Sequence, residues 1–162
     1  MKPLFILLAV FLCTALLLKW RKRPHIWRVS GSVALSAMFL FTAMGHFLFT
    51  EGMAMMIPDF IPYRTEIVYL TGVLEILFAI GILLPKTRKF TAWSIIVFLI
   101  LVLPANIYAA MHNVDYQTAT HNGNGLEYLW FRIPFQLLLI FWSVALTGNK
   151  SVAPSGELPQ GQ

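Results

Sequence analysis

Charged residues and cysteine are scarce in this 162-residue chain. Only 12% of the residues are Asp, Glu, Lys or Arg, whereas a soluble domain carries about one-quarter. Together with 58% hydrophobic residues, this scarcity excludes an ordinary soluble domain and predicts an integral membrane protein. The single cysteine, Cys13, cannot form an intrachain disulfide or a C-x-x-C thiol relay. A redox role would therefore need electrons from a bound cofactor or a partner.

The patterns that support catalysis by one chain alone are also missing from the sequence. It contains no His, Cys, Asp or Glu set at metal-ligand spacing, no matched pair of histidines for a haem, and no nucleophile with an oriented base. The net charge of +5 comes without a basic groove or an aromatic stacking platform, so it gives no support to nucleic-acid binding. We therefore do not expect a stand-alone enzyme.

Five apolar stretches approach or reach the roughly 20 residues that a helix needs to cross a bilayer. They cover residues 3–18, 29–49, 66–84, 91–111 and 129–147. The first is the shortest and resembles a signal peptide in length, but its basic residues follow the apolar run and no A-x-A cleavage site is present. We expect an uncleaved signal anchor, with a cleaved segment as the alternative. The predicted fold is an all-α, polytopic membrane helical bundle.

The basic residues lie mainly on one side of the predicted spans. Nine of them share this side: Lys19, Arg21, Lys22, Arg23, Arg28, Lys86, Arg88, Lys89 and Lys150. The positive-inside rule places this side in the cytoplasm. The sequence thus predicts a multi-pass protein of the cell (inner or plasma) membrane, with its N-terminus outside and its C-terminus in the cytoplasm.

Composition divides the chain into three parts. Residues 1–28 form the signal-anchor span and a basic cytoplasmic segment, residues 29–147 form a four-helix membrane domain, and residues 148–162 form a Gly-, Pro- and Ser-rich tail that we expect to be disordered and cytoplasmic. The loop after the second span combines two prolines with large apolar side chains. We expect four of these side chains to form a lid over the bundle: Met55, Ile57, Phe60 and Ile61.

Polar residues inside the spans suggest a site. They are His46, Glu75, Asn106, Arg132 and Gln136. A charged group inside a bilayer needs a partner, a proton or water. Because helical side chains lean toward the N-terminus of their helix, we expect Glu75 to converge in depth with His46 and Asn106, with Arg132 at the mouth. This predicts a ligand or proton site, and the alternative is a purely structural polar network.

Four sequence segments resemble the DoxX-like family of small membrane proteins. They read "MGHFLFTEGMAMMIPDFIP", "LTGVLEILFAIGILLPKTRKFTAW", "LVLPANIYAAMH" and "RIPFQLLLIFW", and the resemblance extends over roughly residues 30 to 147. It implies a four-helix bundle of the DoxX, DoxD or MauE type, to which the first span is an addition. Relatives of these types are linked with thiosulfate:quinone oxidoreductase, with membrane oxidoreductase complexes and with maturation of a partner enzyme.

Three function classes follow from the residues and the resemblance together. The first is an accessory component of a membrane redox assembly that binds a quinone or another small ligand, in which Glu75 and His46 handle a proton and Arg132 or Asn106 holds a ligand oxygen. The second is a small-molecule or proton-coupled carrier. The third is a membrane scaffold or assembly chaperone. The expected partners are the lipid bilayer and a membrane or extracytoplasmic protein.

Overall fold

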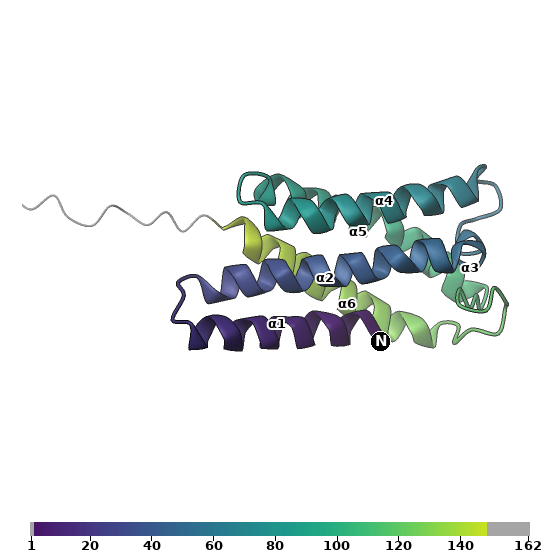
Figure 1. Cartoon of the computed structure of the whole chain (residues 1–162). Helices are drawn as coiled ribbons and strands as arrows, with labels where there is room; N and C mark the ends of the chain where they lie inside the picture. The colour runs from purple at the N-terminus through teal and green to yellow at the C-terminus, as the bar shows by residue number, and fades with distance from the viewer. Residues whose placement is uncertain (1, 149–162) are drawn as a thin grey trace, which may run out of the picture.

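The computed structural model describes residues 2–148, and their regular structure is helical apart from one isolated bridge between Asp115 and Thr120 (Figure 1). The helices are α1 (Lys2–Trp20), α2 (Ile26–Leu48), α3 (Thr50–Ala54), α4 (Arg64–Leu83), α5 (Arg88–Met111) and α6 (Glu127–Thr147). The predicted all-α helical bundle is therefore confirmed, whereas its DoxX-like core stays a prediction. Of the tail predicted to be disordered, residues 149–162 lie outside the described residues.

Five of the helices, α1, α2, α4, α5 and α6, are long and apolar enough to cross a membrane. They coincide with the five apolar stretches of the sequence. The largest differences are at α2 and α5, which begin at residues 26 and 88 rather than at 29 and 91. Both helices extend into polar residues because a helix needs no apolar side chains at a membrane surface. The short helix α3 occupies the start of the loop that contains the two prolines.

Helix α2 occupies the centre of the bundle. It packs against α1 on one side and α4 on the other, while α5 packs against α4 and α6. Figure 1 shows α6 running obliquely across the other long helices. The turns 21–25 and 84–87 lie together at one end, called here the basic end. The segment 49–63 and the loop 112–126 lie at the opposite end, called here the α3 end.

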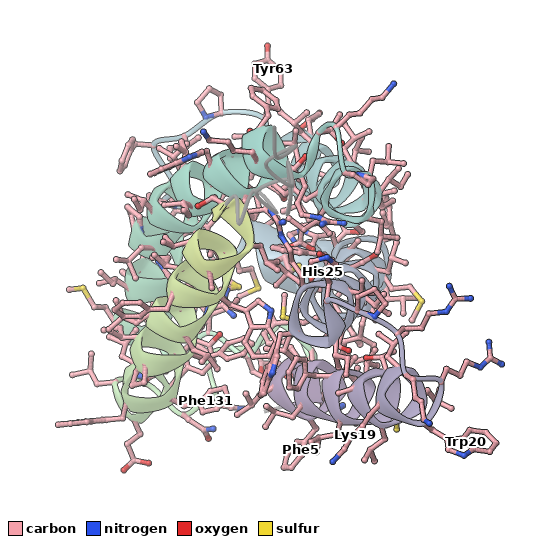
Figure 2. The ribbon with its side chains drawn as sticks, turned by 90° about the vertical axis from the view of Figure 1, so that its left-hand side faces the viewer. Phe5, Lys19, Trp20, His25, Tyr63 and Phe131 are labelled. Carbon is pink, nitrogen blue, oxygen red and sulfur yellow. The ribbon has the colours of Figure 1, made fainter. Side chains whose placement is uncertain are left out.

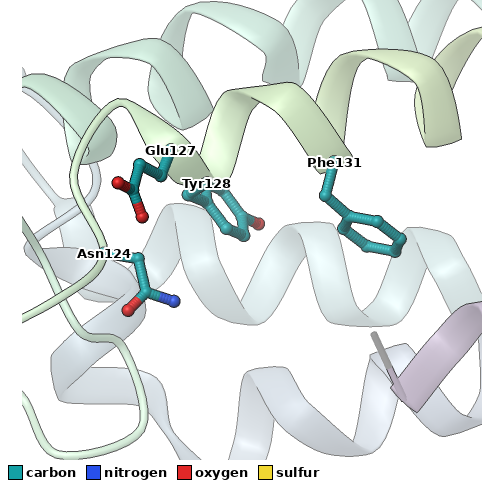
Figure 3. A pocket seen from close by; sticks show the side chains of 4 residues that line it. All are labelled: Asn124, Glu127, Tyr128 and Phe131. Carbon is teal, nitrogen blue, oxygen red and sulfur yellow. The ribbon is translucent and has the colours of Figure 1, made fainter.

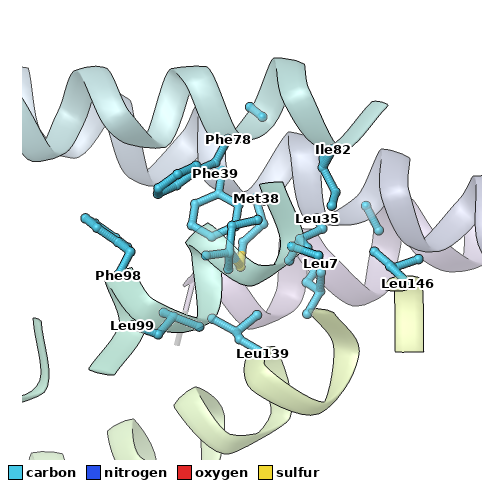
Figure 4. Packing of buried hydrophobic residues seen from close by; sticks show 14 of the residues in the cluster. Leu7, Leu35, Met38, Phe39, Phe78, Ile82, Phe98, Leu99, Leu139 and Leu146 are labelled. Carbon is cyan, nitrogen blue, oxygen red and sulfur yellow. The ribbon is translucent and has the colours of Figure 1, made fainter. Parts of the chain in front are cut away.

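A single apolar cluster joins the five long helices (Figure 4). Its large members include Leu7, Leu35, Met38, Phe39, Phe78, Ile82, Ile95, Phe98, Leu99, Phe135, Leu139 and Leu146. Three phenylalanines form its middle, because Phe78 meets Phe39 and Phe98 edge to face at centroid distances of 6.0 and 5.3 Å. Helix α1 contributes one buried residue, Leu7, so it lies at the periphery of the bundle.

Two glycines of α4 allow close approach to the neighbouring helices. A Cβ atom on Gly72 would lie 2.8 Å from the Cβ of His46 in α2, and a Cβ on Gly81 would overlap the Thr91 hydroxyl in α5. Helices within a bilayer associate through such small residues, because close backbone approach increases van der Waals contact. Gly72 thereby sets the spacing of α2 and α4 at the level of His46.

Candidate intramembrane polar site

His46 of α2 and Glu75 of α4 face each other across the helix interface. The distance from His46 Nε2 to Glu75 Oε2 is 3.6 Å, and the two side chains are 17% and 9% exposed. This separation is within the range of an ion pair but is longer than an ordinary hydrogen bond. The structure brings His46 and Glu75, two of the three residues expected to converge in depth, next to each other, whereas their role as a site stays a prediction.

Thr71 fixes the other side of the imidazole ring. Its Oγ1 lies 3.1 Å from His46 Nδ1 and donates a hydrogen bond to the Val68 carbonyl at 2.8 Å. Because a hydroxyl group has one hydrogen, the Nδ1 atom must donate to Oγ1 when that hydrogen points at the carbonyl. In this arrangement of hydrogen bonds the ring proton is on Nδ1, and Nε2 faces Glu75.

Sequence reasoning missed Thr71, although its signal was available. Thr71 precedes Glu75 by four residues, and side chains at this spacing lie on one face of a helix. A hydroxyl one turn from a buried carboxyl was therefore a candidate for contact with the same partner. In the structure both side chains lie against the imidazole ring of His46, Thr71 at Nδ1 and Glu75 at Nε2.

The hydrogen bonding of Glu75 is incomplete in this pair. Glu75 Oε2 is buried and has no hydrogen-bond partner within residues 2–148. With Nδ1 protonated, an unprotonated Nε2 and an ionised carboxylate would point lone pairs at each other. One added proton, on either Nε2 or Oε2, would remove this repulsion and leave the pair without net charge.

The two amides of the predicted site bind backbone groups instead. Asn106 is buried, and its Nδ2 donates to the Val102 carbonyl of its own helix at 2.9 Å. Gln136 Nε2 donates to the Leu99 carbonyl at 2.7 Å and so links α6 to α5. Both acceptors are close to Pro104, which interrupts the hydrogen bonding of α5. In the described part of the chain no hydrogen bond joins either amide to Glu75.

Arg132 forms no ion pair with Glu75 in the described part of the chain. Residues 2–148 contain two ion pairs, His46 with Glu75 and Arg64 with Asp59, and Arg132 belongs to neither. Its Nε atom is buried without a hydrogen-bond partner among these residues. In the loop 112–126, burial raises the pKa of the Tyr116 phenol and Tyr128 adds to the rise, whereas the hydrogen bond with Gln117 and the charge of Arg132 oppose it.

The four predicted lid residues differ in burial. Ile57 is buried and Met55 and Ile61 are partly buried, but Phe60 is 83% exposed and covers nothing in this structure. A different contact closes the α3 end, where a Cβ on Gly52 of α3 would overlap the Tyr116 carbonyl. Phe49 also meets Tyr116 edge to face at 6.1 Å. The loop 112–126, which has a polar sequence, thus packs against α3.

Two hollows are present at the surface. One of about 210 Å³ is lined by Asn124, Glu127, Tyr128 and Phe131 at the start of α6 (Figure 3). The other is lined by four residues of α1: Cys13, Leu16, Leu17 and Trp20. None of the five predicted site residues lines either hollow. The His46–Glu75 pair is therefore packed between helices rather than exposed in these hollows.

Fold and site together define an all-helical bundle with five helices suited to cross a membrane and a His–Glu pair between two of them. Residues 35–147 match the family described as Domain of unknown function (DUF8561), and the chain belongs to this family. The matched segment contains all five predicted site residues, whereas α1 lies outside it. No curated protein and no solved structure matches the chain. The resemblance to DoxX-like proteins stays a prediction.

Proposed function

We propose that this protein binds and releases a proton in the membrane through the His46–Glu75 pair, as an accessory, small-ligand-binding component of a membrane redox assembly. One observation carries the proposal: the imidazole is held by Thr71 on one side and lies 3.6 Å from a buried carboxyl on the other. The resemblance to DoxX-like proteins supports the redox assembly and suggests a quinone as the ligand. The positive-inside rule would put the pair in the outer half of the bilayer.

The chemistry of the two groups suits this role. Imidazole gains and loses its proton nearer to neutral pH than any other unperturbed side chain. When the pair holds one proton, that proton can sit on His46 or on Glu75 without a change in net charge. A ligand or a partner that changes the local field can therefore shift the proton or release it. A redox reaction in the same membrane creates a charge, and the field of this charge would couple the reaction to the movement of the proton.

A scaffold function is the second candidate, and specific contacts favour it for two residues. The side-chain amides of Asn106 and Gln136 donate to the carbonyls of Val102 and Leu99, which precede Pro104 in α5. These bonds stabilise the bundle, and within residues 2–148 neither amide forms a hydrogen bond with Glu75. We therefore assign these amides to the structure and confine the proposed proton chemistry to His46, Glu75 and Thr71. A proton-coupled carrier would use the same three residues.

Proton counting tests the first part of the proposal. The purified protein in lipid nanodiscs is moved from about pH 5 to about pH 9. Both pH values lie above the pH at which an unperturbed carboxyl group titrates. The released protons are measured with an indicator dye. The double variant His46→Gln with Glu75→Gln should release about one proton fewer than the wild type. Glu66→Gln, which changes an exposed carboxylate of the same helix, serves as the control and should match the wild type. Equal release by all three proteins would contradict the proposal.

Identification of bound molecules tests the second part. Gentle purification followed by mass spectrometry of lipids, quinones and proteins should find a small ligand or a redox partner with the wild type. The variant Glu75→Gln, which preserves shape, should retain less of it, and Glu66→Gln should retain the same amount. A wild-type protein that carries neither would favour the scaffold.

A further inference from the structure

Within residues 2–148, the basic end of the bundle carries no carboxylate. Residues 1–50 and 76–114 contain no Asp or Glu. The described acidic residues are Glu51, Asp59, Glu66, Glu75, Asp115 and Glu127, which lie within α4 or toward the α3 end. The basic end carries eight described cations: Lys19, Arg21, Lys22, Arg23, Arg28, Lys86, Arg88 and Lys89. Their counter-charges must therefore come from outside these residues.

Two of the eight cations differ from the rest in burial. The other six side chains are exposed, and Figure 2, which views this end, shows Lys19 and Trp20 pointing away from the bundle. Arg28 and Arg88 are partly buried. The Nε atom of Arg28 is buried and has no hydrogen-bond partner in the described part of the chain. An unpartnered guanidinium donor removed from water is unfavourable unless an acceptor reaches it.

Arg88 is held in a fixed position at the end of α4. Its Nε donates to the Ile82 carbonyl at 3.1 Å and its Nη2 donates to the Leu83 carbonyl at 3.2 Å, at the end of α4. These bonds leave the Nη1 donors for another acceptor. Arg28 lies in the first turn of α2, which packs against α4, so these two like charges lie at the same end of neighbouring helices. An anion between them would relieve the repulsion and accept the free donors.

We propose that Arg28 and Arg88 together bind the phosphate group of an anionic membrane glycerophospholipid at the basic end, between α2 and the α4–α5 turn. Guanidinium groups match the oxygens of a phosphate in a forked geometry. Both residues lie at the ends of helices long enough to cross a membrane, where lipid headgroups are found. Trp20 and Trp27 are exposed at the same end, as aromatic side chains at headgroup depth commonly are. This site is independent of the His46–Glu75 pair.

Native mass spectrometry with defined lipids tests this site. The wild type is released from nanodiscs that contain phosphatidylglycerol or phosphatidylcholine, and bound lipid is counted and titrated. Phosphatidylglycerol should be retained selectively, and Arg28→Gln or Arg88→Gln should weaken its binding by about tenfold, as expected for loss of a charge-assisted contact. Lys89→Gln is the matched control, because it removes an exposed cation next to Arg88. Its effect should stay within about twofold, since exposed charges contribute little.

Three further outcomes decide the source and the specificity of the bound anion. If Lys89→Gln weakened lipid binding as much as Arg28→Gln, the binding would come from diffuse electrostatic attraction of the lipid to the basic end, and the proposed site would be wrong. If inorganic phosphate displaced phosphatidylglycerol at equal concentration, a free anion would be the ligand and the lipid assignment would be wrong. Should the glutamine variants fail to fold, Arg28→Lys and Arg88→Lys keep the charge but lose the fork, and each should still weaken retention. Unchanged retention in both lysine variants would overturn the forked phosphate contact.

Discussion

Gly72 of α4 lies directly against His46 of α2, so closely that a Cβ atom on the glycine would be 2.8 Å from the Cβ of the histidine. The glycine is three residues before Glu75 and one after Thr71, and both of these residues contact the imidazole ring of His46. Close helix packing and the polar pair are thus features of one short segment of α4. The same contact that brings the helices together therefore sets the distance between His46 and Glu75.

The variant Gly72→Ala should separate α2 and α4 at the pair. Because the added methyl group meets a Cβ atom that cannot move independently of its backbone, we expect a loss of about 1–3 kcal/mol in unfolding free energy. Thermal and denaturant unfolding in detergent would measure it. Gly45→Ala is the control, since its nearest contact is the flexible end of Met53 at 3.3 Å. An equal loss in both variants would contradict the special role of Gly72.

The variant Thr71→Val should release the imidazole from its assigned tautomer. Valine keeps the shape of threonine but removes the oxygen that accepts from Nδ1, so the proton should redistribute between the two ring nitrogens. Nitrogen NMR of histidine-labelled protein would detect this change at His46. Thr71→Ser retains the hydroxyl group and should restore the wild-type spectrum. A wild-type spectrum of a neutral imidazole with its only proton on Nε2 would show that the assignment is wrong.

Glu75 variants should separate folding from proton binding. Glu75→Gln preserves shape and hydrogen bonding, so its stability should stay close to that of the wild type. Glu75→Leu leaves His46 Nε2 facing an apolar side chain, and an unsatisfied buried polar group costs about 1–3 kcal/mol. Unfolding measurements on both variants, with Glu66→Leu as an exposed control, would check this order. A leucine variant as stable as the glutamine variant would mean that the pair contributes nothing to folding.

The variant Gln136→Leu tests the structural role of the buried amide. It removes the hydrogen bond to the Leu99 carbonyl, and interhelical hydrogen bonds in membranes contribute about 0.6 kcal/mol on average. We expect a small loss of stability and unchanged proton release. A loss of the measured proton release in this variant would show that Gln136 takes part in the functional site.

The long helices could be predicted from the sequence because apolar runs of sufficient length have one stable arrangement in a bilayer. The meeting of His46 and Glu75 followed from the lean of helical side chains on antiparallel helices. The hydrogen-bond partner of Asn106 could not be predicted, because a short amide side chain can reach a carbonyl of its own helix as easily as it can reach a neighbouring helix. The exposed position of Phe60 and the contact of Gly52 with Tyr116 depend on how irregular segments pack, and hydrophobic periodicity does not encode this.

Infrared difference spectroscopy of Glu75 tests the proton pair most directly. The protein is reconstituted in bilayers and titrated from about pH 4 to about pH 9, a range that spans the unperturbed carboxyl and imidazole groups. The proposal predicts a carboxyl signal that changes with pH in the wild type, persists in Glu66→Gln, shifts in His46→Gln and is absent from Glu75→Gln. A Glu75 carboxylate whose bands stay ionised and unchanged over the whole range would show a permanent salt bridge and would contradict the proposed proton site.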